Sequence, residues 1–431
     1  MIVTPSAGRA NPLHSATGDH PAGGAGDSTR SGVQIACVFA TRPGRSPPPP
    51  PFAMSCLSIS GAVLRTNARQ RPYTESQPLR IEPLHLDPPQ AHEVLVRITA
   101  AGLCHSDLSV IDGNRPRPLP MLLGHEAVGD VVDLGADVRD LAVGDQVVCS
   151  FVPSCGQCVP CATGRPALCE PAAVANGAGT LLGGGRRLRD AHGDVVHHHL
   201  GVSAFADHAV VSRRSLIRID RSVPAPVAAL FGCAVLTGVG AIANTAHLRL
   251  GETVLVTGLG GIGLAAVLGA LAAGAGTVIA ADVHEDKLAQ ATRLGAHHVV
   301  NTAAPDAAEQ VRALTNGGVD VGVECAGVVA ALEFTWRATR RGGRTVTAGL
   351  PHSSQQLALA PVQLVAEERS LQGSYLGGSV PVRDIPAYLA LYQTGRLPVD
   401  RLLTHTLPLR DINVGFERLA AGAAVRQVVT F

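Results

Sequence analysis

The stretch Thr253-Val254-Leu255-Val256-Thr257-Gly258-Leu259-Gly260-Gly261-Ile262-Gly263 decides the fold of this 431-residue chain. A short apolar run, Thr253 to Val256, enters a glycine turn of the form G-x-G-x-x-G, and a helix-forming run, Ile262 to Ala273, leaves it. The next strand pattern ends at Asp282. The glycine pattern alone is weak in a chain with 48 Gly. Between a strand and a helix, and followed by an acidic residue at this interval, it predicts a dinucleotide-binding turn.

This turn would bring a pyrophosphate close to the N-terminus of the following helix. The residues that would contact the cofactor there are Gly258, Gly260, Gly261, Ile262 and Gly263. Asp282 would accept hydrogen bonds from the ribose hydroxyls and repel a 2′-phosphate, which favours NAD over NADP. Lys287, the only lysine, either reaches the same ribose or is a solvated helix residue. An ordinary glycine turn in an α/β sheet is the alternative to the whole interpretation.

Strand and helix patterns alternate after Thr253, and this alternation predicts a parallel, doubly wound sheet. The further strand patterns are Val278 to Ala281, Ala296 to Val300, Val319 to Glu324, and Gly343 to Gly349. From about residue 60 to 230 the signals are short β-branched runs bounded by Pro, Gly or Asp, such as Glu93 to Ile98 and Asp145 to Cys149. They predict a mostly β, loop-rich domain in which the glycine-rich segment Asn176 to Gly185 is a mobile loop. The expected fold is therefore α/β with two domains.

Residues 1–53 are rich in Pro and Gly, include the run Pro47 to Pro51, and are expected to form a disordered tail. Either translation starts at Met54 or this tail is dispensable. The chain has 35 basic and 34 acidic residues, so it lacks the positive surface that nucleic acid would need. The longest apolar run, Val227 to Ala243, is shorter than the roughly 20 residues of a membrane span. Without a secretory signal, a cytoplasmic protein with neither nucleic-acid nor membrane partner is expected.

Four of the ten cysteines follow the spacing C-x2-C-x2-C-x7-C, at Cys155, Cys158, Cys161 and Cys169. On a loop rich in Gly and Pro, side chains so close together cannot all enter a core. Their clustering favours reduced thiols over disulfides, and four thiolates arranged around one tetrahedral zinc ion would hold such a lobe together.

A second group of potential ligands is spread over three segments: Cys104 follows Gly102-Leu103, His125 stands in Gly124-His125-Glu126, and Cys233 lies where the two domains meet. Two thiolates and one imidazole with one open position form a known catalytic zinc arrangement. The thiolates would neutralise the dication and leave a site that can polarise an alcohol or carbonyl oxygen.

In these motifs the chain resembles the zinc-dependent medium-chain alcohol dehydrogenases, and among them the liver-type and class III branch, from about residue 60 to Phe431. The resemblance implies a GroES-like catalytic domain over residues 54–234 and 376–431, with the structural zinc lobe at 155–169. It implies a Rossmann NAD-binding domain over residues 235–375. Two zinc ions per chain follow from it, a catalytic ion held by Cys104, His125 and Cys233, and a structural ion held by the four clustered cysteines.

The same resemblance implies roles for the neighbours of the catalytic ligands. Ser106 would take the alcohol proton, Asp107 would orient the ligand histidine, and Glu126 would stand behind the zinc. The remaining cofactor-binding positions that it implies are His105, Thr237, Ala348, Gly349, Leu350, Ser374, Tyr375, Leu376 and Arg426. Phe151 is similar to a pocket-wall aromatic, and an ordinary core phenylalanine is the equal alternative.

The reaction that the resemblance implies is hydride transfer from an alcohol to C4 of NAD, which gives an aldehyde or a ketone. The chain departs from the liver-type pattern at Ser109, where many of those enzymes have a histidine that passes the proton to solvent. Here the proton would leave through Ser109 with water, or through His105, and both routes stay open. Pairing of strand edges near Leu371 to Leu376 would give a dimer or a tetramer.

Two other functions compete with a general alcohol dehydrogenase. An S-(hydroxymethyl)glutathione dehydrogenase of class III needs cationic groups at the pocket mouth, yet the segment after Cys169 has no arginine before Arg186 and Arg187. A non-catalytic zinc- and NAD-binding regulatory protein, or a zinc-ribbon binding module, is the alternative from a different class. The lobe has only Arg165 between its first and last cysteine, and the complete open zinc site also argues for catalysis.

Overall fold

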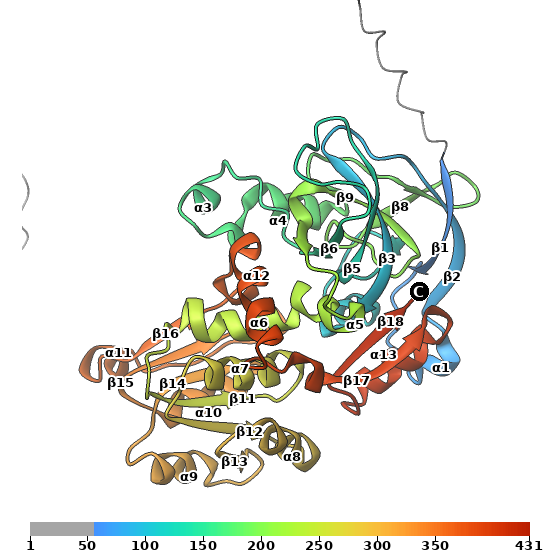
Figure 1. Ribbon diagram of the computed structural model, residues 1–431. Helices are drawn as coiled ribbons and strands as arrows, with labels where there is room; N and C mark the ends of the chain where they lie inside the picture. The colour runs from blue at the N-terminus through green and yellow to red at the C-terminus, as the bar shows by residue number, and fades with distance from the viewer. Residues whose placement is uncertain (1–55) are drawn as a thin grey trace, which may run out of the picture. The chain divides into compact units, whose positions relative to one another are not determined.

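The computed structural model describes residues 56–431, so the expected tail over residues 1–53 and the expected start at Met54 lie outside the described residues. Within the described part, the strands form one parallel sheet, one larger sheet of mostly antiparallel pairs and a small closed barrel (Figure 1). The parallel sheet consists of β11 (Thr253–Thr257), β12 (Thr277–Asp282), β13 (His298–Asn301), β14 (Val319–Glu324), β15 (Thr339–Thr347) and β16 (Ser370–Gly373).

The order of this sheet is β13-β12-β11-β14-β15-β16, and every neighbouring pair is parallel. The first strand, β11, therefore lies in the middle, and the chain winds outward from it in both directions, as predicted for a doubly wound sheet. The order reverses at β11, and ligands of such sheets bind at the carboxyl ends of the strands at this point. The glycine turn follows β11 directly.

Helices connect the strands of this sheet: α7 (Gly261–Ala272), α8 (Glu285–Leu294), α9 (Ala307–Leu314), α10 (Val329–Ala338) and α11 (Pro361–Ala366). Val254, Leu255 and Val256 of β11 are fully buried, which explains why this strand is an uninterrupted apolar run rather than an alternating one. Small residues let α7 pack closely against its neighbour, since a Cβ at Gly269 would stand 3.0 Å from the Cα of Val239.

The larger sheet has the order β10-β6-β5-β3-β18-β17. The strand β9 pairs with the N-terminal part of β3, whereas β18 pairs with its C-terminal part. The strands of this sheet are β3 (Glu93–Gly102), β5 (Glu126–Leu134), β6 (Gln146–Cys149), β9 (His208–Ser212), β10 (Leu216–Ile219), β17 (Leu403–Pro408) and β18 (Arg426–Thr430). The barrel has the strands β1 (Leu57–Leu64), β2 (Leu79–Leu86), β4 (Met121–Leu122), β7 (Leu188–Arg189) and β8 (Val195–His198). Because β18 pairs with β3, the end of the chain returns to the first domain's sheet; the exact domain boundaries stay a prediction.

The helices outside the parallel sheet are α1 (Tyr73–Ser76), α2 (His105–Ile111), α3 (Val159–Ala162), α4 (Glu170–Ala178), α5 (Ala225–Ala229), α6 (Ala234–Gly240), α12 (Pro381–Gln393) and α13 (Ile412–Ala420). In residues 56–431 no single helix is long and apolar enough to cross a membrane. The bent helix pair Ala225–Gly232 and Ala234–Thr245 has the length and apolar composition of a membrane span, and most of its residues are buried in the folded chain.

The prediction of a mobile loop over residues 176–185 is wrong at its start. The helix α4 extends to Ala178, and it ends where Gly179 adopts a φ of +66°. Asn176 is buried and donates a hydrogen bond from Nδ2 to the carbonyl of Phe151 at 2.9 Å. The preceding alanines, which favour helix, and this tertiary contact outweigh the glycine signal.

Candidate active site

Three side chains from separate segments meet in a buried cluster. Cys104 follows β3 and precedes α2, His125 precedes β5, and Cys233 precedes α6. Their ligand atoms all lie within 4.8 Å of one another. His125 Nε2 is buried and has no hydrogen-bond partner among the described residues, although buried polar atoms are normally paired. Two thiols and an unpartnered imidazole nitrogen fit a zinc ion, with room in its coordination sphere for a substrate oxygen.

Asp107 holds this cluster in place. Its Oδ1 lies 3.2 Å from His125 Nδ1, and its Oδ2 accepts a hydrogen bond from the Cys104 amide at 3.2 Å. Burial alone would lower the pKa of His125, but Asp107 and Cys104 raise it well above its usual value. Because Asp107 contacts Nδ1 of His125, the other ring nitrogen, Nε2, is the one that faces the two thiols.

A second histidine, His199, shares the same carboxylate, because its Nδ1 lies 3.1 Å from Asp107 Oδ1. It is fully buried, and its ring stands edge-on to that of His125 at 5.5 Å between centroids. Sequence reasoning missed this residue. No local pattern marks His199 within its run of three histidines, since its partner lies in a distant helix.

Behind the cluster, Glu126 forms a buried ion pair with Arg426 at the start of β18. Its other oxygen accepts a hydrogen bond from the Ala234 amide at 3.2 Å. Burial raises the pKa of Glu126 to about 7, although the Arg426 guanidinium opposes that rise. A Cβ on Gly261 would collide with Arg426, so this arginine lies directly against the glycine turn. One ion pair thus connects the thiol cluster to the turn.

A cleft of about 380 Å³ runs from the cluster to the glycine turn. His105, Ser106 and Ser109 of α2 line it beside Cys104, and Arg426 also lines it. Ser106 is half-buried. The hydroxyl of Ser109 donates a hydrogen bond to the carbonyl of His105 at 2.8 Å. The side chains that sequence reasoning assigned to proton transfer therefore face one cavity.

The opposite side of the cleft is formed by the glycine turn, Gly258 to Ile262, with Asp282 and Lys287. Gly258 has a φ of +88°, and a Cβ there would stand 2.6 Å from the Ala326 amide nitrogen. A Cβ on Gly260 would meet open space, which leaves the backbone accessible to a pyrophosphate. Gly263 packs too tightly against Gly258 to carry a side chain. The turn has the shape that a dinucleotide requires.

The Asp282 carboxylate is held at the edge of this cleft. Oδ2 accepts a hydrogen bond from the Leu259 amide at 2.7 Å, and Oδ1 accepts one from the His284 amide at 3.1 Å. Lys287 Nζ lies 3.9 Å from Oδ2, so the lysine leans toward the carboxylate rather than into solvent alone. Asp282 also borders an adjoining pocket of about 300 Å³ that contains Val283 and Ala304.

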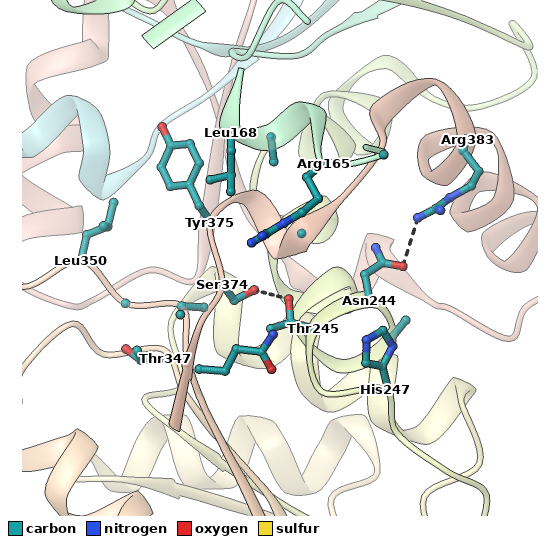
Figure 2. A pocket seen from close by; sticks show the side chains of 18 residues that line it. Arg165, Leu168, Asn244, Thr245, His247, Thr347, Leu350, Ser374, Tyr375 and Arg383 are labelled. Atoms are coloured by element: carbon teal, nitrogen blue, oxygen red, sulfur yellow. Dashed lines mark hydrogen bonds between the residues drawn. The ribbon is translucent and has the colours of Figure 1, made fainter. Parts of the chain in front are cut away.

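A larger cavity of about 740 Å³ adjoins the cleft, and both are lined by Ala348, Gly349 and Leu350 (Figure 2). Ser374 and Tyr375 line only the larger one, where the Ser374 hydroxyl lies 2.8 Å from that of Thr245. Two further positions assigned to the cofactor lie in the interior: Thr237 is buried on α6, and Leu376 is buried with a φ of +51°.

Aromatic rings extend from the cluster toward this larger cavity. Phe151 lies edge-on to His125 at 5.3 Å and edge-on to Tyr375 at 6.1 Å between ring centroids. Phe151 is buried, whereas 40% of Tyr375 is exposed. In Figure 2, Tyr375 stands beside Leu168 of the cysteine lobe and across from Leu350. Phe151 belongs to the main hydrophobic core and also contacts His125, so both interpretations of its role stay open.

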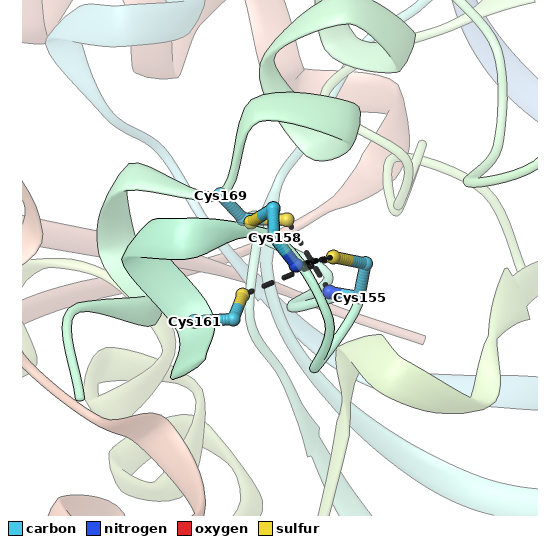
Figure 3. Close-up of side chains that lie close together, drawn as sticks. All are labelled: Cys155, Cys158, Cys161 and Cys169. Carbon is cyan, nitrogen blue, oxygen red and sulfur yellow. Dashed lines mark hydrogen bonds between the residues drawn. The ribbon is translucent and has the colours of Figure 1, made fainter. Parts of the chain in front are cut away.

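The four clustered cysteines converge around one point, as Figure 3 shows. The Sγ atoms of Cys155 and Cys161 are 4.0 Å apart, too far for a disulfide and close enough to share one ion. The amides of Gln157 and Cys158 donate to Cys155 Sγ at 3.4 Å each, and these hydrogen bonds lower the pKa of Cys155 to about 6. The backbone amides thus favour the thiolate of Cys155, and the convergence of the four cysteines suits one bound cation.

Two arginines near the site come from a segment that sequence reasoning did not consider. Arg115 lines the cleft in the loop after α2, and Arg117 follows it. The arginines that were considered point elsewhere: Arg187 forms a buried ion pair with Glu93, and Arg186 donates to His197 Nδ1 at 3.2 Å.

Comparison with known proteins shows two family matches. Residues 90–221 match the alcohol dehydrogenase GroES-like domain, and residues 261–394 match the zinc-binding dehydrogenase domain.

Solved structures similar to this chain cover nearly all of its described part. An alcohol dehydrogenase zinc-binding domain protein from Burkholderia ambifaria is 34% identical with a TM-score of 0.83, over 88% of this chain and 100% of that one. A benzyl alcohol dehydrogenase from Acinetobacter calcoaceticus is 30% identical with a TM-score of 0.81, over 87% and 99%. A putative zinc-binding dehydrogenase from Sinorhizobium meliloti 1021, bound to NADP, is 26% identical with a TM-score of 0.71, over 87% and 100%.

Proposed function

Because the chain belongs to the family of zinc-binding medium-chain alcohol dehydrogenases, we propose that it transfers hydride between a small alcohol and NAD to give an aldehyde or ketone. The chain is an oxidoreductase that uses zinc and a nicotinamide cofactor. The observation that carries the proposal is the cleft that Cys104 of the thiol–imidazole cluster shares with the glycine turn. A non-catalytic regulatory protein would have no need for a cluster that opens onto a dinucleotide site.

The donor sets suit one zinc ion at Cys104, His125 and Cys233 and a second at Cys155, Cys158, Cys161 and Cys169. When bound, the first ion polarises the substrate oxygen, and the nicotinamide accepts or donates the hydride. The second ion holds the lobe together and takes no part in the reaction. In support of NAD over NADP, the Asp282 carboxylate lies at the edge of the cleft beside the glycine turn, where it would repel a 2′-phosphate.

The protein side chains move the proton and exclude water. The hydroxyl of Ser106, which lines the cleft beside Cys104, receives the alcohol proton. From there the proton leaves through Ser109 or His105, which lie one helical turn apart on α2 and face the same cleft. The edge-on contact between the rings of Phe151 and Tyr375 supports an apolar wall that would exclude water from the reacting carbon. Asp107 keeps His125 in the tautomer that presents Nε2 to the metal.

Within the family we propose the liver-type and class III branch, and one observation favours a class III activity as the second candidate. That activity, oxidation of S-(hydroxymethyl)glutathione, needs cationic groups at the mouth of the pocket. The loop after α2 supplies Arg115 there, with Arg117 close by. A faster rate with formaldehyde plus glutathione than with any simple alcohol would identify this activity.

The proposal is tested by zinc analysis together with alcohol-dependent NADH absorbance. We expect two zinc ions per chain and NADH formation with ethanol or a longer alcohol. Cys104→Ala and His125→Ala should each abolish turnover, yet retain the circular dichroism spectrum and NADH binding, because neither residue belongs to the glycine turn. Cys56→Ser, at an exposed cysteine outside both clusters, is the matched control. Unchanged turnover in Cys104→Ala or His125→Ala would refute the assignment of the site.

A further inference from the structure

We propose that His199 is a positioning residue of the zinc site: it holds the Asp107 carboxylate, and this carboxylate in turn keeps His125 oriented so that Nε2 faces the metal. The inference rests on the proposed function, because it assumes a zinc ion at the thiol–imidazole cluster. His199 is neither a ligand of that ion nor a contact of the substrate, and it acts only through Asp107.

The Asp107 carboxylate is the group on which the cluster depends. The side chain is fully buried, and both of its oxygens are engaged. Oδ1 lies 3.2 Å from His125 Nδ1 and accepts a hydrogen bond from the Gly124 amide at 3.1 Å. Oδ2 accepts one from the Cys104 amide at 3.2 Å. A buried carboxylate is stable only with such partners, so the groups that surround it determine its orientation.

His199 is a further partner of the same oxygen. Its Nδ1 lies 3.1 Å from Asp107 Oδ1, although the direction is not that of a well-aligned hydrogen bond. We assign a hydrogen to this nitrogen, because a bare lone pair at that distance would repel the carboxylate. Among the described residues the buried Nδ1 has no other hydrogen-bond partner, so its attraction is directed at Asp107.

The backbone leaves the ring of His199 little freedom. Its amide donates to the Ser203 hydroxyl at 2.9 Å, and its carbonyl accepts from the amides of Val202 and Ser203 at 3.1 and 3.3 Å. Leu200 and Ser203 in this turn have φ values of +50° and +56°, which are uncommon for residues other than glycine. Only 1% of His199 is exposed. The turn therefore presents the ring to Asp107 in one fixed position.

Of the three consecutive histidines, His199 is the one that serves this site. His197 Nδ1 accepts a hydrogen bond from Arg186 at 3.2 Å, and His198 Nε2 accepts one from the Arg187 amide at 3.0 Å. Both belong to β8 of the barrel, whereas His199 follows that strand directly. His198 is as deeply buried as His199, so it offers a matched control for the loss of a buried imidazole.

Loss of this partner should weaken the zinc site. Without His199 the buried carboxylate has one donor fewer, and it can turn toward the two backbone amides and away from His125 Nδ1. We expect His199→Phe, which keeps an aromatic ring and removes the nitrogen, to release zinc about tenfold faster, the lower end of what partners behind metal ligands contribute. His199→Asn restores an N–H donor near the place of Nδ1 and should release zinc at nearly the wild-type rate.

The rate at which a chelator removes zinc measures this effect and needs no turnover. The ion that wild type holds and Cys104→Ala lacks belongs to the thiol–imidazole cluster. His199→Phe should accelerate the release of this ion alone, so the ion of the cysteine lobe is an internal control. His198→Phe should release both ions at the wild-type rates.

A double-mutant cycle separates positioning from a general effect on packing. In an Asp107→Asn background His199 has no carboxylate to hold, so His199→Phe should not accelerate the release of zinc any further. If His199→Phe does not fold, the cycle is run with His199→Met, because methionine fills irregular space in a core.

Three results would overturn the inference and leave the proposed function intact. The first is wild-type release in His199→Phe, or equally fast release in His199→Asn and His199→Phe. The second is the same acceleration in the Asp107→Asn background. The third is an additional metal ion that His199→Phe removes, because Asp107, His125 and His199 would then be ligands themselves. If instead Cys104→Ala has the metal content of wild type, the zinc site and the proposed function fail together.

Discussion

At the scale of single residues, we expect the cofactor preference to depend on Asp282. Its carboxylate is held by two backbone amides at the carboxyl end of β12, so its orientation at the edge of the cleft is fixed. Burial makes its repulsion of a 2′-phosphate stronger than it would be in water.

We predict that Asp282→Asn lowers the ratio of kcat/KM for NAD over NADP by about tenfold or more, since the loss of one charge at this distance amounts to at least about 1.4 kcal/mol. The amide preserves the shape of the side chain and one acceptor for the turn. Steady-state kinetics with both cofactors checks this, with Asp286→Asn on the exposed face of α8 as control. An unchanged ratio would show that another group selects the cofactor.

Single residues also show which parts of the site can be predicted from sequence patterns. The residues Cys104, His125 and Cys233 could be proposed as one site from their residue types and the resemblance, but not from their spacing, because their spacing in the sequence is unrelated to their spacing in the fold. The structure brings them together, and their role as ligands stays a prediction. His199 and Arg115 belong to no motif, and only the tertiary structure shows what they face.

At the scale of elements, the cysteine lobe has little core of its own. Cys155, Cys158 and Cys161 are only partly buried, and Val159 between them is 72% exposed. Metal binding must therefore supply most of the free energy that folds the lobe.

We predict that Cys158→Ser removes one of two zinc ions and makes the segment 154–169 accessible to protease, because three ligands hold the metal far more weakly than four. Mass spectrometry of the metal content and limited proteolysis measure both effects. Cys56→Ser should change neither. A lobe that resists protease after it has lost its metal would show that packing, not zinc, holds it.

The strand β8 contains a histidine that couples the stability of the barrel to pH. His198 Nε2 accepts a hydrogen bond from the Arg187 amide at 3.0 Å, and its Nδ1 is buried without a partner among the described residues. Burial, with Arg187 and Arg186 nearby, lowers the pKa of His198 to about 3. In the unfolded chain the same imidazole has a pKa of about 6.5.

Between pH 6.5 and 3 the unfolded state therefore binds a proton that the folded state does not, so the free energy of unfolding must fall as the pH falls. We predict a loss of up to about 1.4 kcal/mol per pH unit from this residue. Urea titrations at several pH values should show a smaller slope in His198→Gln than in wild type. The exposed His192→Gln should keep the wild-type slope; equal slopes in all three proteins would exclude the mechanism.

At the scale of the whole molecule, β16 forms an edge of the parallel sheet, and most of its residues are exposed. An unpaired edge offers backbone groups to a second copy of the chain. We predict a dimer or tetramer by sedimentation velocity. In that assembly Gln372→Glu places like charges close to each other across the two-fold axis and shifts the equilibrium toward monomer. Added salt should partly restore the assembly, whereas a monomeric wild type would contradict the prediction.

Much of the fold was determined by the sequence alone, because its signals are local. The glycine turn between a strand and a helix, the alternation after Thr253 and the spacing of the four cysteines each constrain backbone or metal geometry within a few residues of chain. The two-domain α/β fold predicted from them is confirmed. The segment around Asn176 was misjudged because a tertiary hydrogen bond to Phe151 supports the helix there.

Only the tertiary structure decided what surrounds the reacting atoms. The ion pair of Glu126 with Arg426 and the shared carboxylate between His125 and His199 join segments that are far apart in the chain. Burial and electrostatic interactions depend on distances in space. These distances cannot be derived from the amino-acid sequence without the complete fold. The motifs therefore indicate which reaction this chain can perform. The residues that surround the site in the folded chain determine which alcohol it accepts.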